Sequence, residues 1–384
     1  MRGDELPELP KINRMSAKEF GEVLRADAEE RDAEDSPWDD VLQALSLLPP
    51  GESSLEASIE EAADSVAAFY DPETKEVTVI TDAGAMPSDP RDRAYVLSHE
   101  LTHALQDRAH DLKKRHEMAA GSTDRRMALG MLVEGEATAT STRVMLRLFN
   151  RTADEFDFDA FFDKMDDSLL GAVKKSSAPL FTVYQGLPYS IGGRYVAHVW
   201  EQRDRRGVEA LFDEAPPTAA DWLRGDLGDP GDTSSEPLDC GPPQAPPGFE
   251  LYELDHFGAT GVVAMLAAHA TVDLTLASQL TNDAFALYVT EAAEPTASKP
   301  VLGVWRLRFE TGRATDEFEQ ILMRASLKPR RSGTELTVRV SSPEAEAELQ
   351  GTELDACPKL SDLKPTHGAP TMPEAAWKPH GRPR

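Results

Sequence analysis

The sequence predicts an α+β fold in which a helix-rich larger part, carrying one small pair of strands, is followed by a smaller α+β unit. Three observations lead to this prediction. Apolar residues recur with helical spacing through most of residues 90–206, two short segments before them read as strands, and further strand-like segments follow a stretch rich in proline and glycine. With 384 residues, the chain is long enough for two domains and a sizeable core.

Breaks in composition divide the chain into five segments. The first is acidic and helix-rich, with interruptions at Ser-Pro and Pro-Pro-Gly sequences. The last is rich in proline and poor in apolar residues, so we expect it to be disordered. In chain order, the segments are an N-terminal helical segment (1–65), a helix-rich domain with the strand pair (66–224), a linker (225–249), an α+β domain (250–360) and a tail (361–384).

Charge and hydropathy exclude several classes of partner. The net charge of −28 argues against nucleic acid and anionic membranes, and no apolar run is long enough for a membrane helix. The N-terminus shows no signal peptide, so we expect a cytosolic protein or a chain that begins after a removed signal. Cys240 and Cys357 either form a disulfide, which would favour an extracytoplasmic location, or remain two thiols.

Two short strands are expected at residues 66–70 and 76–81, joined by a turn. A helix follows, with Asp89 as its N-cap and Pro90 at its first position, and it continues to about residue 115. One apolar stripe of this helix is expected to pack in the core, and it comprises Leu97, Leu101, Ala104 and Leu105.

The opposite side of this helix carries the sequence His99-Glu100-Leu101-Thr102-His103. Two histidines four residues apart lie on one side of a helix and can bind the same zinc ion. Glu100 can then take a proton from a water held by the metal. The alternative is an ordinary amphipathic helix whose two histidines only make hydrogen bonds.

Zinc needs a third protein ligand and, for catalysis, an open position for water. Glu134 is the best candidate because it lies in the most apolar part of a second helix, predicted over 124–150, where a lone carboxylate is costly to bury. Glu136 is the competitor, but it points about 200° away. A structural ion pair is the remaining interpretation. Gly135 and Ala137 would let this helix approach the first one closely.

Two further helices are expected in the same domain, at about 153–172 and 189–206. The second contains Gly192 and Gly193, which each cost a helix about 1 kcal/mol relative to alanine, so a close helix crossing or a nearby ligand is expected there. The first is rich in phenylalanine, and we expect core positions rather than a substrate pocket for Phe156, Phe158, Phe161 and Phe162.

The C-terminal unit carries no recognisable chemistry. His256 and His269 have no ligand spacing and are expected to pack or to face solvent. The unit would restrict access to a site, bind a partner or stabilise the first domain. Its expected elements are helices at 259–270 and 314–325 and strands at 284–290, 301–310 and 335–340.

The pattern His99-Glu100-x-x-His103 followed by Glu134-Gly135-x-Ala137 resembles that of the zincin metallopeptidases with glutamate as third ligand, the gluzincins. An asparagine precedes the glutamate in that family, whereas this chain has Val133. Thr138 stands where thermolysin-like enzymes place an aspartate behind the ligands. The residues that orient the ligands here are therefore not given by the resemblance.

A wider resemblance connects the chain to a group of largely uncharacterised bacterial and archaeal proteins regarded as metallopeptidases. It covers about residues 40–225 and implies a zincin-like fold, a Zn²⁺ cofactor and a peptide or protein substrate. In zincins a strand beside the cleft pairs with an extended peptide through main-chain hydrogen bonds. The predicted strand pair either does this or only covers the core. The matching blocks are residues 47–51, 68–75, 99–107, the Glu134 segment and residues 188–192.

For a peptidase of this kind, the resemblance implies that His99, His103 and Glu134 bind the metal and that Glu100 is the general base. The negative charge on the reacting carbonyl oxygen also needs a hydrogen-bond donor. Tyr189 is the first choice because it opens the predicted helix within the matching block. The other candidates are Tyr184 and His198.

Two other functions stay open. One is a catalytically inactive, zincin-like binding or scaffold protein with at most a structural metal; the intact Glu100 argues against it, since a structural site needs no carboxylate there. The other is a metallohydrolase for a non-peptide amide or ester, which would use the same metal residues.

Overall fold

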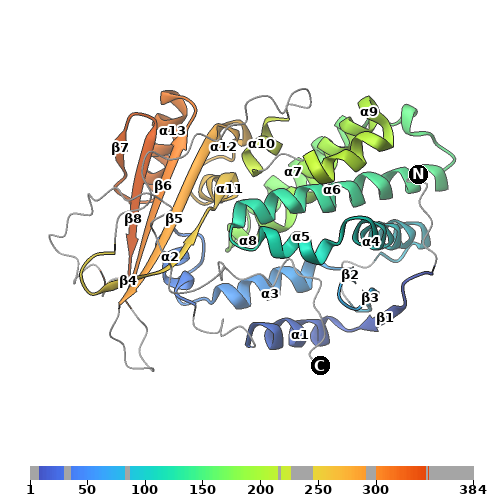
Figure 1. The fold of residues 1–384 in the computed structure, drawn as a ribbon, viewed down its shortest axis with the longest axis horizontal. Coiled ribbons are helices and arrows are strands. Elements are labelled where there is room, and N and C mark those ends of the chain that lie inside the picture. Colours follow the sequence, from blue (N-terminus) through green and yellow to red (C-terminus); the bar gives the residue numbers. More distant parts are fainter. Residues whose placement is uncertain are drawn as a thin grey trace.

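The structure, a computed structural model, describes residues 8–29, 36–82, 87–214, 218–225, 245–290, 300–342 and 345. It combines helices with two small sheets, which confirms the predicted α+β class. The larger sheet lies at one end of the molecule and a group of long helices at the other (Figure 1). Cys240, Cys357, most of the predicted linker and the predicted tail lie outside the described residues. No helix in the described ranges is long and apolar enough to cross a membrane.

The larger sheet has five antiparallel strands in the order β4-β5-β6-β8-β7. The sequence did not predict β4, because the acidic side chains of Glu253 and Asp255 are buried within it. The helices of this part lie beside the sheet (Figure 1). The elements are β4 (Phe249–Asp255), α11 (Gly258–His269), α12 (Leu274–Ser278), β5 (Leu280–Thr290), β6 (Val301–Phe309), α13 (Gly312–Arg324), β7 (Arg330–Ser332) and β8 (Glu335–Ser341).

An N-terminal helix, α2 (Trp38–Ala44), packs against this sheet. The fully buried indole of Trp38 lies 5.1 Å from the ring of Phe285 and 5.3 Å from that of Phe257, measured between centroids. Its Nε1 donates a hydrogen bond to Glu253 at 3.1 Å, so the indole N–H is satisfied inside the core. One continuous hydrophobic core therefore includes residues from α2, the sheet and the long helices.

The smaller sheet has the strand order β1-β3-β2, with β1 and β3 parallel and β2 and β3 antiparallel. The strands β2 (Ala68–Asp71) and β3 (Glu76–Ile80) confirm the predicted strand pair. The third strand, β1 (Ile12–Met15), was not predicted because its pairing partner is more than 60 residues away in the sequence. The helices α1 (Ala17–Glu29) and α3 (Ser54–Ser65) pack against each other beside this sheet.

The remaining helices form the middle and the other end of the molecule (Figure 1). The first of them, α4, ends earlier than predicted because Asp111 adopts a left-handed conformation (φ 52°) and its side chain accepts a hydrogen bond from Lys114 N, which starts α5. The elements are α4 (Pro90–His110), α5 (Leu112–Ala119), α6 (Thr123–Leu148), the 3-10 helix η1 (Ala153–Glu155), α7 (Phe158–Val173), α8 (Pro179–Leu187), the π-helix η2 (Pro188–Gly192), α9 (Gly193–Glu214) and α10 (Ala219–Arg224).

Buried carboxylates attach the start of α6 to the larger sheet. Asp255, at the end of β4, accepts hydrogen bonds from the backbone N–H and the hydroxyl of Thr123, the first residue of α6. The next N–H, that of Asp124, donates to the carbonyl of His256 at 2.8 Å. These bonds satisfy N–H groups that a helix terminus leaves free, and a negative charge there is favourable. The sheet thus fixes the position of the long helix α6.

A close backbone crossing fixes the middle of α6. A Cβ on Gly135 would lie 2.4 Å from the carbonyl carbon of Gly192 in η2, and a Cβ on Gly192 would lie 2.2 Å from the carbonyl oxygen of Met131. The expectation that Gly135 serves the contact with the first metal helix is therefore wrong, since Gly135 faces the π-helix. The predicted close crossing at Gly192 is confirmed.

We predict that Gly192→Ala lowers the free energy of unfolding by about 1–3 kcal/mol, because the added Cβ meets a backbone oxygen that cannot rotate away. Gly171→Ala in α7 is the matched control, since a Cβ there has no neighbour within 4 Å, and it should be neutral or slightly stabilising. Denaturant unfolding of the two variants measures both effects. Equal stability of the two proteins would contradict the crossing.

Candidate metal centre

Helix α4 buries a different face from the one predicted. Of the predicted apolar stripe, Ala104 is buried, whereas the three leucines are only half-buried. The helix packs on α6 through its polar face instead, because carboxylates and a carbonyl of α6 provide partners for it. The polar residues buried on α4 are His99, Glu100, Thr102, His103, Gln106 and Asp107.

Three of the predicted residues meet between α4 and α6. His99 Nε2 lies 2.8 Å from Glu134 Oε2, and His103 Nε2 lies 3.4 Å from the same oxygen. One ligand atom from each of the three residues lies within 4.8 Å of the other two. In a tetrahedral zinc site with bonds of about 2.0–2.2 Å, neighbouring ligand atoms are roughly 3.3–3.6 Å apart. The donor set therefore fits a zinc ion after a small opening of the His99–Glu134 contact.

Gln106 determines which nitrogen of His103 faces Glu134. Its amide nitrogen donates to Val133 O and to Glu136 Oε2, each at 2.9 Å, so its amide oxygen faces His103 Nδ1, which lies 2.8 Å away. Because that oxygen can only accept, Nδ1 carries a proton and Nε2 is directed to Glu134. Metal-binding histidines commonly have such a hydrogen bond at the nitrogen that faces away from the metal.

Glu136 is thus part of the support rather than a ligand. Its carboxylate is buried on α6 and accepts the hydrogen bond from Gln106, which is itself fully buried. Helical spacing places Gln106 near the histidine face, but it does not indicate this role. Gln106 contacts His103 from the histidine's own helix. The resemblance concerned positions 133 and 138 of the second helix, and so it did not indicate this residue.

The pKa values of His99, His103 and Glu134 depend on one another, because the three side chains are in contact. Burial lowers the pKa of His99, which is therefore neutral near pH 7. Burial acts in the same direction on His103, but the neighbouring Glu134 and Glu100 outweigh it and raise the pKa of His103 to about 9. Burial would raise the pKa of Glu134, but the two imidazoles hold it well below its usual range. A metal ion would take the place of the His103 proton that now faces this carboxylate.

Glu100 lies beside these residues without belonging to the ligand set. Burial raises the pKa of Glu100 to about 8, with His103 opposing and Glu134 adding to the shift. The backbone N–H of Tyr70 in β2 faces this carboxylate and opposes the rise of its pKa. The strand β2 is therefore in direct contact with the candidate general base.

Asp107, one turn further along α4, connects the small sheet to the helix. Its carboxylate accepts hydrogen bonds from the hydroxyl of Tyr70 at 2.9 Å and from the ammonium group of Lys75. Its other oxygen accepts from Leu112 N and so caps α5. The position of β2 relative to Glu100 depends on these contacts.

Tyr189 is the predicted oxyanion donor that the structure brings to the site. Its ring stacks on His99 with a centroid distance of 5.6 Å and an interplanar angle of 17°, and its hydroxyl lies near the Glu134 carboxylate. Burial and the nearby carboxylates raise the pKa of Tyr189 well above its usual value, so the phenol stays protonated. The side chain is nevertheless 37% exposed, which leaves it accessible from solvent. It belongs to η2, and π-helices occur frequently at functional sites.

The two other candidate donors lie elsewhere. Tyr184 is buried in the hydrophobic core on α8. His198 Nε2 lies 2.7 Å from a carboxylate oxygen of Asp159 in α7. In the C-terminal part, His256 Nδ1 bonds to the carbonyl of Asp283 and His269 to that of Leu45, so both pack as predicted.

Comparison with protein-family models, with curated proteins and with solved structures finds no match to this chain.

We predict that Gln106→Leu weakens zinc binding about 10- to 100-fold, because His103 loses the partner that holds its ring and directs Nε2. Competition with a chromophoric chelator measures the dissociation constant. Asp107→Asn is the matched control, because it removes a buried charge from the same helix. The side chain of Asp107 contacts the small sheet and not His103. An unchanged zinc affinity in Gln106→Leu would contradict the positioning role.

Proposed function

We propose that the chain is a zinc-dependent hydrolase that cleaves peptide bonds. The observation that carries the proposal is the convergence of His99, His103 and Glu134 on one point, with the carboxylate of Glu100 beside them but outside the ligand set. A structural metal site needs no such extra carboxylate. A catalytic zinc site has three protein ligands, an open position and a nearby base.

In this proposal His99 Nε2, His103 Nε2 and the Glu134 carboxylate hold the metal. When bound, zinc supplies Lewis acidity that polarises a carbonyl and lowers the pKa of a water. Gln106 keeps His103 in the required tautomer, and the hydrogen bonds of Gln106 to Val133 and Glu136 hold it in place. His103 would thus be oriented before the metal arrives.

Glu100 would act as general base and then as general acid. Because its pKa is raised, Glu100 favours the protonated form at neutral pH. A nearby cation would lower this pKa, so that Glu100 becomes a charged carboxylate that can accept a proton. One oxygen of the Glu100 carboxylate would accept a proton from water as the water oxygen bonds to the carbonyl carbon. Glu100 would then pass this proton to the amine that leaves when the C–N bond breaks. The backbone N–H of Tyr70, which faces Glu100, would stabilise the charged form of this carboxylate before it accepts the proton.

Tyr189 and β2 would act on the substrate itself. The protonated hydroxyl of Tyr189 would turn from the Glu134 carboxylate, once that carboxylate binds the metal, and donate its one hydrogen bond to the oxyanion. The strand β2 is at the edge of its sheet and contacts α4. An extended peptide can bind such an edge through main-chain hydrogen bonds, which favours a peptide over a small ester.

We predict that Glu100→Gln retains zinc but loses peptide hydrolysis by at least about 10²–10⁴-fold, because the amide cannot accept the proton from water. The assay is the turnover of a fluorogenic peptide library by the zinc-loaded protein, with zinc content measured on the same sample. Glu117→Gln, on the exposed surface of α5, is the matched control and should keep full activity.

The same experiment distinguishes the proposed hydrolase from the alternative of an inactive binding protein. If the wild-type chain binds zinc in this site but hydrolyses no peptide, or if Glu100→Gln is as active as the wild type, the proposal is wrong.

A further inference from the structure

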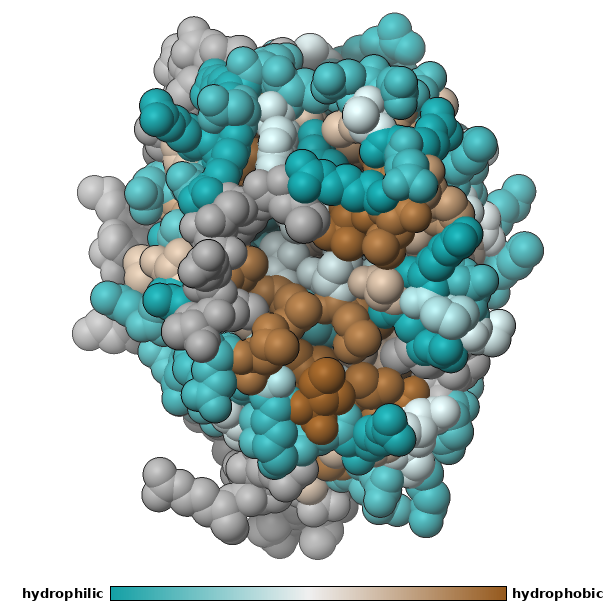
Figure 2. Space-filling view, turned by 90° about the vertical axis from the view of Figure 1, so that its right-hand side faces the viewer, coloured by the Kyte–Doolittle hydropathy of each residue, from teal (hydrophilic) through white to brown (hydrophobic). Residues whose placement is uncertain are grey.

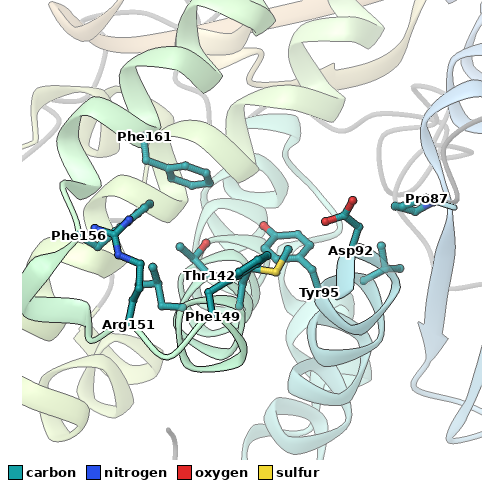
Figure 3. Close-up of a pocket in the computed structure, with 11 residues that line it drawn as sticks. Pro87, Asp92, Tyr95, Thr142, Phe149, Arg151, Phe156 and Phe161 are labelled. Carbon is teal, nitrogen blue, oxygen red and sulfur yellow. The ribbon is translucent and has the colours of Figure 1, made fainter. Parts of the chain in front are cut away.

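A cavity of about 640 Å³ opens between the first turns of α4 and the last turns of α6, with Phe156 and the α7 residue Phe161 closing its far side (Figure 3). The sequence did not predict it, because two stretches that are far apart in the chain, residues 87–96 and 142–161, form it. Phe156 and Phe161, which were expected in the core, are half-buried and line it instead, while Phe158 and Phe162 are buried as expected. Its apolar lining is formed by Val96, Met145, Leu146, Phe149, Phe156 and Phe161.

The cavity begins next to the candidate metal centre. Tyr95, which lines it, precedes His99 by one turn of α4, about 6 Å along the helix axis. Thr142, which lies beside the Tyr95 hydroxyl, follows Glu134 by two turns of α6, about 12 Å. The phenol of Tyr95 also lies close enough to Tyr189 to interact with it electrostatically. Tyr95 therefore both lines the cavity and lies near Tyr189 of the candidate metal centre.

The interior of the cavity is apolar and its charges lie at the rim. Asp92 and Arg151 stand on opposite sides, with aromatic rings between them (Figure 3). Apolar residues also gather around a hollow on the side of the molecule that Figure 2 shows. A charged substrate side chain placed inside would lose its hydration without gaining a partner, whereas an aromatic or long aliphatic one would be stabilised by burial.

We propose that this cavity binds a bulky apolar side chain of the peptide substrate, one or two residues from the scissile bond. Consecutive Cα atoms are 3.8 Å apart, so a residue next to the bond can direct its side chain past Tyr95. The proposal deepens the proposed function and rests on it. A peptide is favoured over an acyl chain because the edge strand β2 beside Glu100 can bind a main chain, and because hydroxyl groups of Tyr95 and Thr142 line the end nearest the site.

The test uses the full-length, zinc-loaded chain with the Glu100→Gln substitution, so that binding is measured without turnover. The probes are two fluorescein-labelled octapeptides that differ only in a central phenylalanine or serine. We expect the phenylalanine peptide to bind about 10- to 100-fold more tightly by fluorescence anisotropy, since it alone buries an apolar ring.

Two variants assign the difference to the cavity. Phe149, 47% exposed, lines the cavity, whereas its neighbour Leu148, 46% exposed, does not. Both lie at the exposed C-terminal end of α6, so a new carboxylate meets the same unfavourable helix dipole in the two variants. Phe149→Asp should remove most of the preference for phenylalanine, and Leu148→Asp should keep it.

Each outcome decides between the alternatives. Equal binding of the two peptides, or an unchanged preference in Phe149→Asp, would overturn the proposal. Tight binding of palmitate together with equal, weak binding of both peptides would assign the cavity to an acyl chain and overturn it as well. Cleavage by the wild-type chain is measured in parallel: selective binding of the phenylalanine peptide without any cleavage would refute the hydrolase and leave the specificity of the cavity established.

Discussion

A largely enclosed carboxylate between two imidazoles is the interaction on which the centre of this molecule depends. Glu134 reaches His99 and His103 across the contact between α4 and α6, and the two helices pack through polar rather than apolar faces. Such packing is favourable only when every buried polar group has a partner. Gln106, Glu136 and the carbonyl of Val133 complete this network, and the ring nitrogens of His103 are oriented as a result.

The rest of the fold holds this contact in place from both ends. Asp255 and the larger sheet fix the start of α6, while the crossing of Gly135 and Gly192 brings the π-helix, and with it Tyr189, against the same face. The small sheet is held by the bonds of Asp107 to Tyr70 and Lys75, which place the edge strand β2 at Glu100. The larger sheet therefore supports the site from a distance and contributes none of the three ligand residues.

The sequence could predict the residues that local rules govern. Helical spacing brings His99 and His103 together, and the cost of burying a lone carboxylate in an apolar stretch indicates Glu134 as their partner. Long-range pairings were not predictable in this way. Trp38 bonds to Glu253 across more than 200 residues, β1 joins a strand far along the chain, and the cavity combines two distant stretches. The buried face of α4 was misjudged because its partner surface on α6 is polar, and hydropathy alone cannot show that.

The most direct measurement is anomalous diffraction at the zinc absorption edge, from crystals of the full chain grown with zinc. We expect one strong peak bound by His99 Nε2, His103 Nε2 and Glu134, with metal–nitrogen distances of about 2.0–2.1 Å. Glu100 should lie close to this peak but outside bonding distance. Zinc bound by a different set of side chains, or no peak between α4 and α6, would contradict the assignment of a metal centre to this site.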